Sequence, residues 1–207
     1  SFQELNVLLE DVGASLESGC SGTGLELEGV SLADDLPLLV DALNEVLTQP
    51  TFPEEELAKL RGQLLTQLGV LENDTGYRAQ RALAEALYPG HPFGRPRAGT
   101  RASVAHLQRE DLLECYRTQY HPASLVLSVV GAVEAGQVLD MLADTLGQWR
   151  VDSQAPVRSI PDAQTPPGCS VKHIELPGKA QADLVWGVVG LPRTSPDYYA
   201  AMMANLI

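Results

Sequence analysis

The stretch that decides the fold is residues 120–131, which read YHPASLVLSVVG. Its second half is an almost continuous apolar, β-branched run, which is typical of a strand buried on both faces. We therefore predict a buried strand over 124–133. The following residues, 134–146, carry apolar side chains at helical spacing and predict an amphipathic helix. Aromatic residues make up only 5% of the chain, so the core is expected to consist of Leu, Val and Ala in helices packed on a sheet.

The first third of the chain predicts a β-hairpin. Two alternating stretches, 14–20 and 24–30, flank the turn residues SGTG. A Pro- and Gly-rich loop is expected over 89–96. Further helices are predicted over 2–12, from Ser31 or Asp34 to Thr48, and over 53–71, 77–87, 103–107 and 109–119. The predicted fold class is α+β, with a mostly antiparallel sheet and helices packed on one face.

The composition changes after residue 149. Residues 150–169 contain Pro156, Pro161, Pro166 and Pro167, and this stretch predicts a linker. Strands are expected over 170–176 and 182–191, followed by a helix from Ser195. We thus predict an αβ domain over 1–149, a Pro-rich linker over 150–169, and the start of a second αβ repeat over 170–207.

Charge and cysteine content restrict the possible partners. A net charge of −13 argues against nucleic acid and anionic membrane surfaces, which bind Lys and Arg. No apolar run approaches the roughly 18 residues of a membrane span. Cys20, Cys115 and Cys169 show no C-x-x-C spacing, which indicates neither a disulfide framework nor a zinc knuckle. They favour a reducing compartment such as the cytoplasm, although a signal peptide upstream of Ser1 stays open. The chain begins without Met and ends inside a helical pattern, so we expect a piece of a longer protein.

Several passages, in order, carry a resemblance to a known family. They are GASLES at 13–18, GHPFG at 90–94 with the following GT and L-x-x-x-DL, and YHPASLVLSVVG at 120–131. Together they resemble the pitrilysin/insulinase family of zinc peptidases, the inverzincins, which include the processing peptidases. The passages at 179–184 and 196–199 resemble the beginning of that family's next repeat. The resemblance implies that the first domain lacks its N-terminal strand and its H-x-x-E-H helix.

The family's chemistry requires residues that this sequence does not supply. The H-x-x-E-H helix provides two zinc-binding His and a Glu base, and a later Glu-Arg-x-x-x-x-x-Glu helix provides the third ligand. Aligning Arg61 with the motif's Arg puts Gln67 at the ligand position and Leu60 at the supporting acid. Four isolated histidines occur, His91, His106, His121 and His173. The resemblance therefore implies no catalytic residue, no metal ligand and no cofactor in this chain, with zinc in a sister catalytic copy.

Peptide capture is the other half of the family's mechanism. The resemblance implies that peptide adds as a strand to an exposed sheet edge. The matching edge here is Ser15, Leu16, Glu17 and Ser18, with Glu17 in place of the family's Asn. Glu17 equally fits a second interpretation, in which a charged residue protects an edge strand from unwanted pairing.

Three functions follow from the resemblance. The first is a non-catalytic part or subunit of a peptidase, which pairs with a homologous catalytic subunit as a dimer and helps to line a chamber for extended peptides. The second is a purely structural subunit, like the core proteins of respiratory complexes. The third is an active zinc endopeptidase whose catalytic helix lies outside this sequence. Gln67 and Leu60 weigh against the third.

Overall fold

A computed structural model of the chain describes residues 2–21, 24–151 and 159–205. The chain divides into two compact units. Unit 1 comprises Ser1–Arg61 and His106–Arg158, and unit 2 comprises Gly62–Ala105 and Ser159–Ile207. Among the described helices, none is long and apolar enough to cross a bilayer. The two units are described separately below.

Unit 1 places helices around one β-hairpin, as the sequence predicts. Strands β1 (Ser15–Cys20) and β2 (Leu25–Val30) are antiparallel, with Ser15 opposite Val30 and Cys20 opposite Leu25. The helices are α1 (Phe2–Glu10), α2 (Leu36–Thr48), the start of α3 (Glu54–Leu71), α6 (Arg109–Gln119) and α7 (Ala135–Asp144). Short 3-10 turns cover Ala33–Asp35, Pro122–Ser124 and Leu146–Gln148. The predicted α+β class is confirmed.

The connection from α1 to β1 has a local cause. Gly13 has φ of 67°, the left-handed conformation that glycine adopts without steric penalty. The Gly13 amide donates to the carbonyl of Glu10, and the Ala14 amide donates to that of Leu9 at 2.8 Å. This pair of bonds is a Schellman motif, which satisfies the last carbonyls of the helix. The chain therefore leaves α1 in a fixed direction and enters β1.

The core of unit 1 lies where α1, α2 and the hairpin meet. Leu9 is only 2% exposed and packs with Ala14, Leu39 and Ala42. Helix α2 approaches β2 so closely that a Cβ added to Gly29 would lie 2.9 Å from Cδ2 of Leu39. One face of the hairpin is therefore covered by α2, as predicted from the alternating sequence.

Helix α6 is tied to the end of α2 by side-chain hydrogen bonds. The Tyr116 hydroxyl donates to the carbonyl of Leu47 at 2.8 Å, and Nε of Arg109 donates to that of Phe52 at 2.8 Å. Phe52 has φ of 43°, an uncommon conformation for a residue with a side chain. Its ring contacts Tyr116 edge-on, at 6.0 Å between centroids. These contacts hold the α2–α3 turn against α6.

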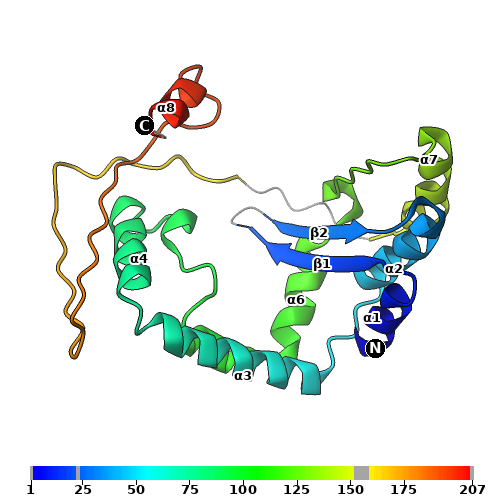
Figure 1. The fold of residues 1–207 in the computed structure, drawn as a ribbon, viewed down its shortest axis with the longest axis horizontal. Helices are drawn as coiled ribbons and strands as arrows, with labels where there is room; N and C mark the ends of the chain where they lie inside the picture. The colour runs from blue at the N-terminus through cyan, green and yellow to red at the C-terminus, as the bar shows by residue number, and fades with distance from the viewer. Residues whose placement is uncertain (1, 22–23, 152–158, 206–207) are drawn as a thin grey trace. The chain divides into compact units, whose positions relative to one another are not determined.

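Three predicted strands are absent from the described structure. Residues 124–133, 170–176 and 182–191 run without strand pairing (Figure 1). Val126 and Val130, predicted to be buried, are 92% and 94% exposed. A strand needs a neighbour to complete its hydrogen bonds, and the described sheet contains only β1 and β2. The three strand predictions are therefore wrong for the described residues, because the pairing that they require does not occur there.

Unit 2 is built around α4 (Thr75–Leu87), with the end of α3, α5 (Arg101–His106), the turn Pro92–Gly94 and α8 (Tyr198–Ala204). Asp74 caps α4, since its Oδ1 accepts from the Tyr77 amide at 2.6 Å. Asp183 accepts a hydrogen bond from the Thr75 hydroxyl at the same helix end. Further along, a Cβ added to Gly187 would lie 3.2 Å from Leu83. Residues 183–187 therefore pack along α4.

The loop after α4 is organised by a histidine. His91 is 8% exposed, and its Nδ1 accepts from the Phe93 amide at 3.1 Å. Its Nε2 therefore carries the proton and donates to the carbonyl of Pro161, 2.8 Å away. Tyr88 and Phe93 contact the ring at centroid distances of 5.6 and 4.8 Å. The predicted linker 150–169 is thus held at Pro161, whereas its residues 152–158 lie outside the described residues, and the domain boundary stays a prediction.

Candidate functional site

The predicted third-ligand position lies on α3. Leu60 and Gln67 are seven residues apart, which is about two helical turns, so they lie along one side of the helix. Leu60 is 52% exposed, and Gln67 is also exposed. Zinc is held by thiolate, imidazole and carboxylate groups, so an amide and an isobutyl group do not fit it. Within the part of the chain that the structure describes, no group of three or more His, Cys, Asp or Glu could hold a metal ion.

Arg61, which aligns with the motif's arginine, is in an unusual environment. Its Nε and Nη2 atoms are buried and have no hydrogen-bond partner among the described residues. A buried guanidinium without a carboxylate costs free energy, because it loses water without regaining hydrogen bonds. The residue that the sequence analysis aligns with the motif's arginine therefore has two buried nitrogens without a described hydrogen-bond partner.

Two of the four histidines act as caps of short turns. His91 caps the turn Pro92–Gly94, as described above. Nδ1 of His121 accepts from the Ala123 amide at 3.1 Å and caps the turn Pro122–Ser124. In both places a His directly precedes a 3-10 turn that begins with Pro. The imidazoles of His91 and His121 therefore have local structural roles.

The four residues predicted to bind peptide lie in one strand of the hairpin, and their binding of peptide stays a prediction. Residues Ser15, Leu16, Glu17 and Ser18 all lie in β1, which pairs with β2 on one side only among the described residues. Leu16 lies opposite Gly29 and is packed against the core, so Leu16 and Ser18 point toward α2. Ser15 and Glu17 point to the open face. The open edge has the backbone geometry that strand addition requires.

The register shows a feature that the sequence alone did not reveal. Glu17 lies directly opposite Glu28, and Glu26 lies opposite Gly19. All three carboxylates are exposed on the open face of the hairpin. Like charges opposite each other in a sheet are destabilising. The open face is therefore strongly acidic.

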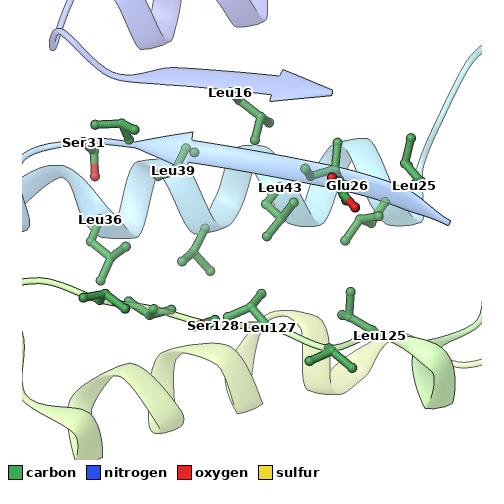
Figure 2. A pocket seen from close by; sticks show the side chains of 18 of the residues that line it. Leu16, Leu25, Glu26, Ser31, Leu36, Leu39, Leu43, Leu125, Leu127 and Ser128 are labelled. Carbon is green, nitrogen blue, oxygen red and sulfur yellow. The ribbon is translucent and has the colours of Figure 1, made fainter. Parts of the chain in front are cut away.

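A cavity lies on the other side of the hairpin, in unit 1, and sequence reasoning missed it. It has a volume of about 1140 Å³ and lies between β2 and residues 124–133. Figure 2 shows Leu36, Leu39 and Leu43 of α2 along it, with Leu125 and Leu127 across from β2. The signal that could have revealed it is the almost continuous apolar run 125–130, which needs two neighbouring strands to be buried.

Two tyrosines near the cavity are protected from ionisation. Burial raises the pKa of Tyr116 above its ordinary value. Burial also raises the pKa of Tyr120, and the thiols of Cys115 and Cys20 raise it further when they ionise. Tyr120, Cys115 and Cys20 all line the cavity. The Tyr120 hydroxyl consequently stays protonated to a higher pH than that of an exposed tyrosine, because its pKa is raised.

Comparisons with known proteins agree along the whole chain. Residues 1–101 match the model of "Insulinase (Peptidase family M16)", and residues 106–207 match that of "Peptidase M16 inactive domain". An uncharacterized zinc protease of Streptomyces coelicolor is 27% identical over 84% of this chain and 39% of its own length. Human cytochrome b-c1 complex subunit 1 is 28% identical over 94% of this chain and 43% of its own length.

A solved structure shows the same fold. The crystal structure of a peptidase M16 inactive domain from Pseudomonas fluorescens superimposes with a TM-score of 0.82 and 21% identity, over 98% of this chain and 49% of that one. The chain spans less than half the length of these three similar proteins.

Proposed function

The chain belongs to the insulinase family of peptidases, M16, and from this premise we propose that it is a non-catalytic part or subunit of a paired zinc peptidase. In this proposal a homologous catalytic copy binds zinc and cleaves peptide bonds. This chain contributes a wall of the peptide-binding chamber. The observation that supports the proposal is on α3, where Leu60 and Gln67 stand at the two positions that the resemblance assigns to the acids of the third-ligand motif.

The physical argument concerns the metal. A catalytic zinc with two His and one Glu keeps a position for the water that it activates. A neutral amide at Gln67 removes the negative ligand, and Leu60 removes the acid one position before the motif's arginine. Since donors of the right chemistry are lacking at positions 60 and 67, we derive no catalytic step through zinc in this chain. The match of residues 106–207 to the family's inactive domain supports the same conclusion.

The open edge of β1 supports a role in peptide binding. An extended peptide that adds to Ser15, Leu16, Glu17 and Ser18 would be held through its backbone, which tolerates many sequences. Glu17 and Glu28 lie on the face of that edge and would favour peptides with Lys or Arg at alternate positions. Replacing Glu17 with Asn is expected to weaken this preference.

The first test is the zinc content of the complete polypeptide, measured by elemental analysis. We expect no stoichiometric zinc in the native protein and none in Gln67→Glu. The matched control is Gln63→Glu, which places the same charge at another exposed position of α3. Stoichiometric zinc in the native protein would refute the proposal and indicate a peptidase with an unusual third ligand. Zinc in Gln67→Glu alone would show that only the third ligand has been lost.

A second candidate function is a purely structural subunit, and the similarity to cytochrome b-c1 complex subunit 1 favours it. The two functions differ in what the chain does to peptide. If the chain is part of a peptidase, adding it to a homologous H-x-x-E-H subunit should raise peptide cleavage, and Glu17→Asn should change which peptides are cleaved. A subunit with only a structural role would leave both unchanged.

A further inference from the structure

His91 is, among the described residues, the only buried side chain that changes charge near neutral pH. Its exposed fraction is 8%, and each ring nitrogen has its own partner. The Phe93 amide donates to Nδ1 at 3.1 Å, and Nε2 donates to the Pro161 carbonyl at 2.8 Å. Both hydrogen bonds exist only while the ring is neutral and carries its proton on Nε2. The folded loop is thus tied to one protonation state of one residue.

Protonation of the ring preserves one of these hydrogen bonds and removes the other. An imidazolium carries an N–H on both nitrogens, so Nε2 can still donate to Pro161. Nδ1–H would instead point at the N–H of Phe93, which leaves two donors 3.1 Å apart with no acceptor between them. A donor that loses its acceptor without regaining water costs free energy. The charged ring therefore favours a turn that has opened.

The surroundings of the ring offer an imidazolium no counter-charge. Within the described part of the chain, no carboxylate forms an ion pair with His91. Tyr88 is the titratable side chain that contacts the ring, at 5.6 Å between centroids. Glu85 of α4 forms an ion pair inside its own helix at 2.7 Å, and Asp162 of the linker and Arg95 of the loop are exposed. Burying a charge without a partner is unfavourable, so acid favours exposure of this ring to water.

A single side chain couples the turn to the predicted linker. The turn has its own backbone hydrogen bonds, from the His91 amide to the Tyr88 carbonyl at 3.2 Å and from the Gly94 amide to the His91 carbonyl at 3.0 Å. The contact with Pro161, 70 residues further along the chain, passes through the imidazole. Opening the turn displaces the ring, and with it the hydrogen bond that holds the linker.

We propose that His91 is a proton-sensitive latch. In its neutral form the ring fastens the linker at Pro161 to the turn Pro92–Gly94, and protonation of Nδ1 releases it. Histidine changes charge between about pH 5 and 8, so the latch opens on mild acidification. The consequence is a linker whose attachment to the loop after α4 depends on pH. This inference goes beyond the proposed function, since it requires neither zinc nor a bound peptide.

Nitrogen-15 NMR of the imidazole tests the ring itself in the unmodified complete chain. At about pH 7.5 we expect the Nε2–H tautomer, and at about pH 5.5 we expect both nitrogens to be protonated. The Phe93 amide should lose its protection from hydrogen exchange over the range in which Nδ1 gains its proton. An Nδ1–H tautomer at the higher pH would overturn the proposal, as would a Phe93 amide that stays protected after the ring is charged.

A matched pair of substitutions separates the two ring nitrogens. The side-chain oxygen of Asn takes the place of Nδ1 as an acceptor, whereas the longer Gln side chain brings its amide nitrogen to the place of Nε2. Exchange is measured at residues 93–95 and divided by the intrinsic rate at each pH. In the native chain we expect this protection to fall about tenfold between pH ~7.5 and pH ~5.5, which corresponds to the loss of one hydrogen bond. His91→Asn should keep high protection at both pH values, and His91→Gln should show low protection at both.

His121 supplies the control, because its Nδ1 caps the turn Pro122–Ser124 in the same way, 3.1 Å from the Ala123 amide. His121→Asn should leave the pH response at residues 93–95 unchanged. A pH response that persists in His91→Asn would overturn the proposal, because another group would then cause it. Equal protection in His91→Asn and His91→Gln would overturn it as well, since Nδ1 would not be the atom that holds the turn.

Discussion

The loop 90–94 offers a severe test of the packing in unit 2, through the substitution Gly94→Ala. A Cβ at this position would fall on the Tyr88 carbonyl oxygen, well inside the 3.0 Å below which Cβ contacts are essentially never found. The obstacle is backbone, so no rotamer change can relieve it. The Gly94 amide also donates to the His91 carbonyl at 3.0 Å, which fixes the turn. The loop must therefore move as a whole.

The expected cost can be estimated from the contacts that move. Overpacking typically costs ~1–3 kcal/mol. The displaced His91 loses at least one of its hydrogen bonds to Phe93 and Pro161, and each contributes ~0.5–1.5 kcal/mol. Local opening of residues 88–94 should thus become easier by roughly 1.5–4.5 kcal/mol. At about 1.4 kcal/mol per factor of ten, this is at least a tenfold increase in amide exchange.

Hydrogen exchange measured by mass spectrometry separates this loop from the rest of the chain. The matched control is Gly62→Ala in α3, where an added Cβ has no neighbour within 4 Å. The control should stabilise α3 by ~0.5–1 kcal/mol, since alanine loses less backbone entropy than glycine. Unchanged exchange at residues 88–94 in Gly94→Ala would refute the reasoning, because it would mean that the loop accommodates the methyl group without losing the His91 contacts.

Four further substitutions test other parts of the structure. Arg61→Met should stabilise the protein by ~1–3 kcal/mol in chemical denaturation, because it removes two buried nitrogens that have no partner; a loss of stability would show that Arg61 has an anionic partner. Asp74→Ala should destabilise α4 by ~1 kcal/mol, and Asp74→Asn much less, since only alanine loses the cap to the Tyr77 amide. Glu28→Lys should stabilise the hairpin by ~0.2–1 kcal/mol through its pairing with Glu17, an effect that high salt should weaken. Tyr116 has a raised pKa, so it contributes stability that is present below pH ~10 and is lost as the pH rises through the folded-state pKa. Tyr116→Phe should therefore weaken the dependence of stability on pH in the alkaline range, measured by circular dichroism. At neutral pH the same substitution should lower the free energy of unfolding by ~0.5–1.5 kcal/mol, because the hydrogen bond to the Leu47 carbonyl is lost.

Helices were predictable here because their signals are local. The segment 109–119 was predicted with the bounds of α6, Arg109–Gln119. Gly13 ends α1 because glycine adopts a positive φ without steric penalty, which is a property of that residue alone. The β-hairpin was predictable for the same reason, since its turn residues lie between the two strands. Residues 124–133 were predicted as a strand and are not one, because a strand also depends on a neighbour that is distant in sequence.

The features of the candidate site also fall into two groups, those set by local sequence and those set by contacts distant in sequence. The positions of Leu60 and Gln67 require only the spacing of a helix, so sequence was sufficient to propose a degenerate third-ligand position. The opposition of Glu17 and Glu28 requires the strand register, which alternation alone does not give. The role of His91 requires a carbonyl 70 residues away, at Pro161. Contacts of this length are invisible in a sequence without homologues.

In unit 2, residues 182–191 leave apolar side chains exposed and have no strand partner among the described residues, as residues 126–130 do in unit 1. One face of this segment is half-buried and packs on α4 through Gly187. The opposite face carries Leu184, Trp186 and Val188, which are 90%, 83% and 78% exposed. Exposing such a row to water forfeits the free energy that burial of apolar area supplies, ~25 cal/mol per Å². Alternation with apolar residues on both faces is the pattern of a strand inside a covered sheet. The sequence therefore specifies more burial than the described residues achieve in either unit, and this deficit supports the proposal that the chain functions within a larger assembly.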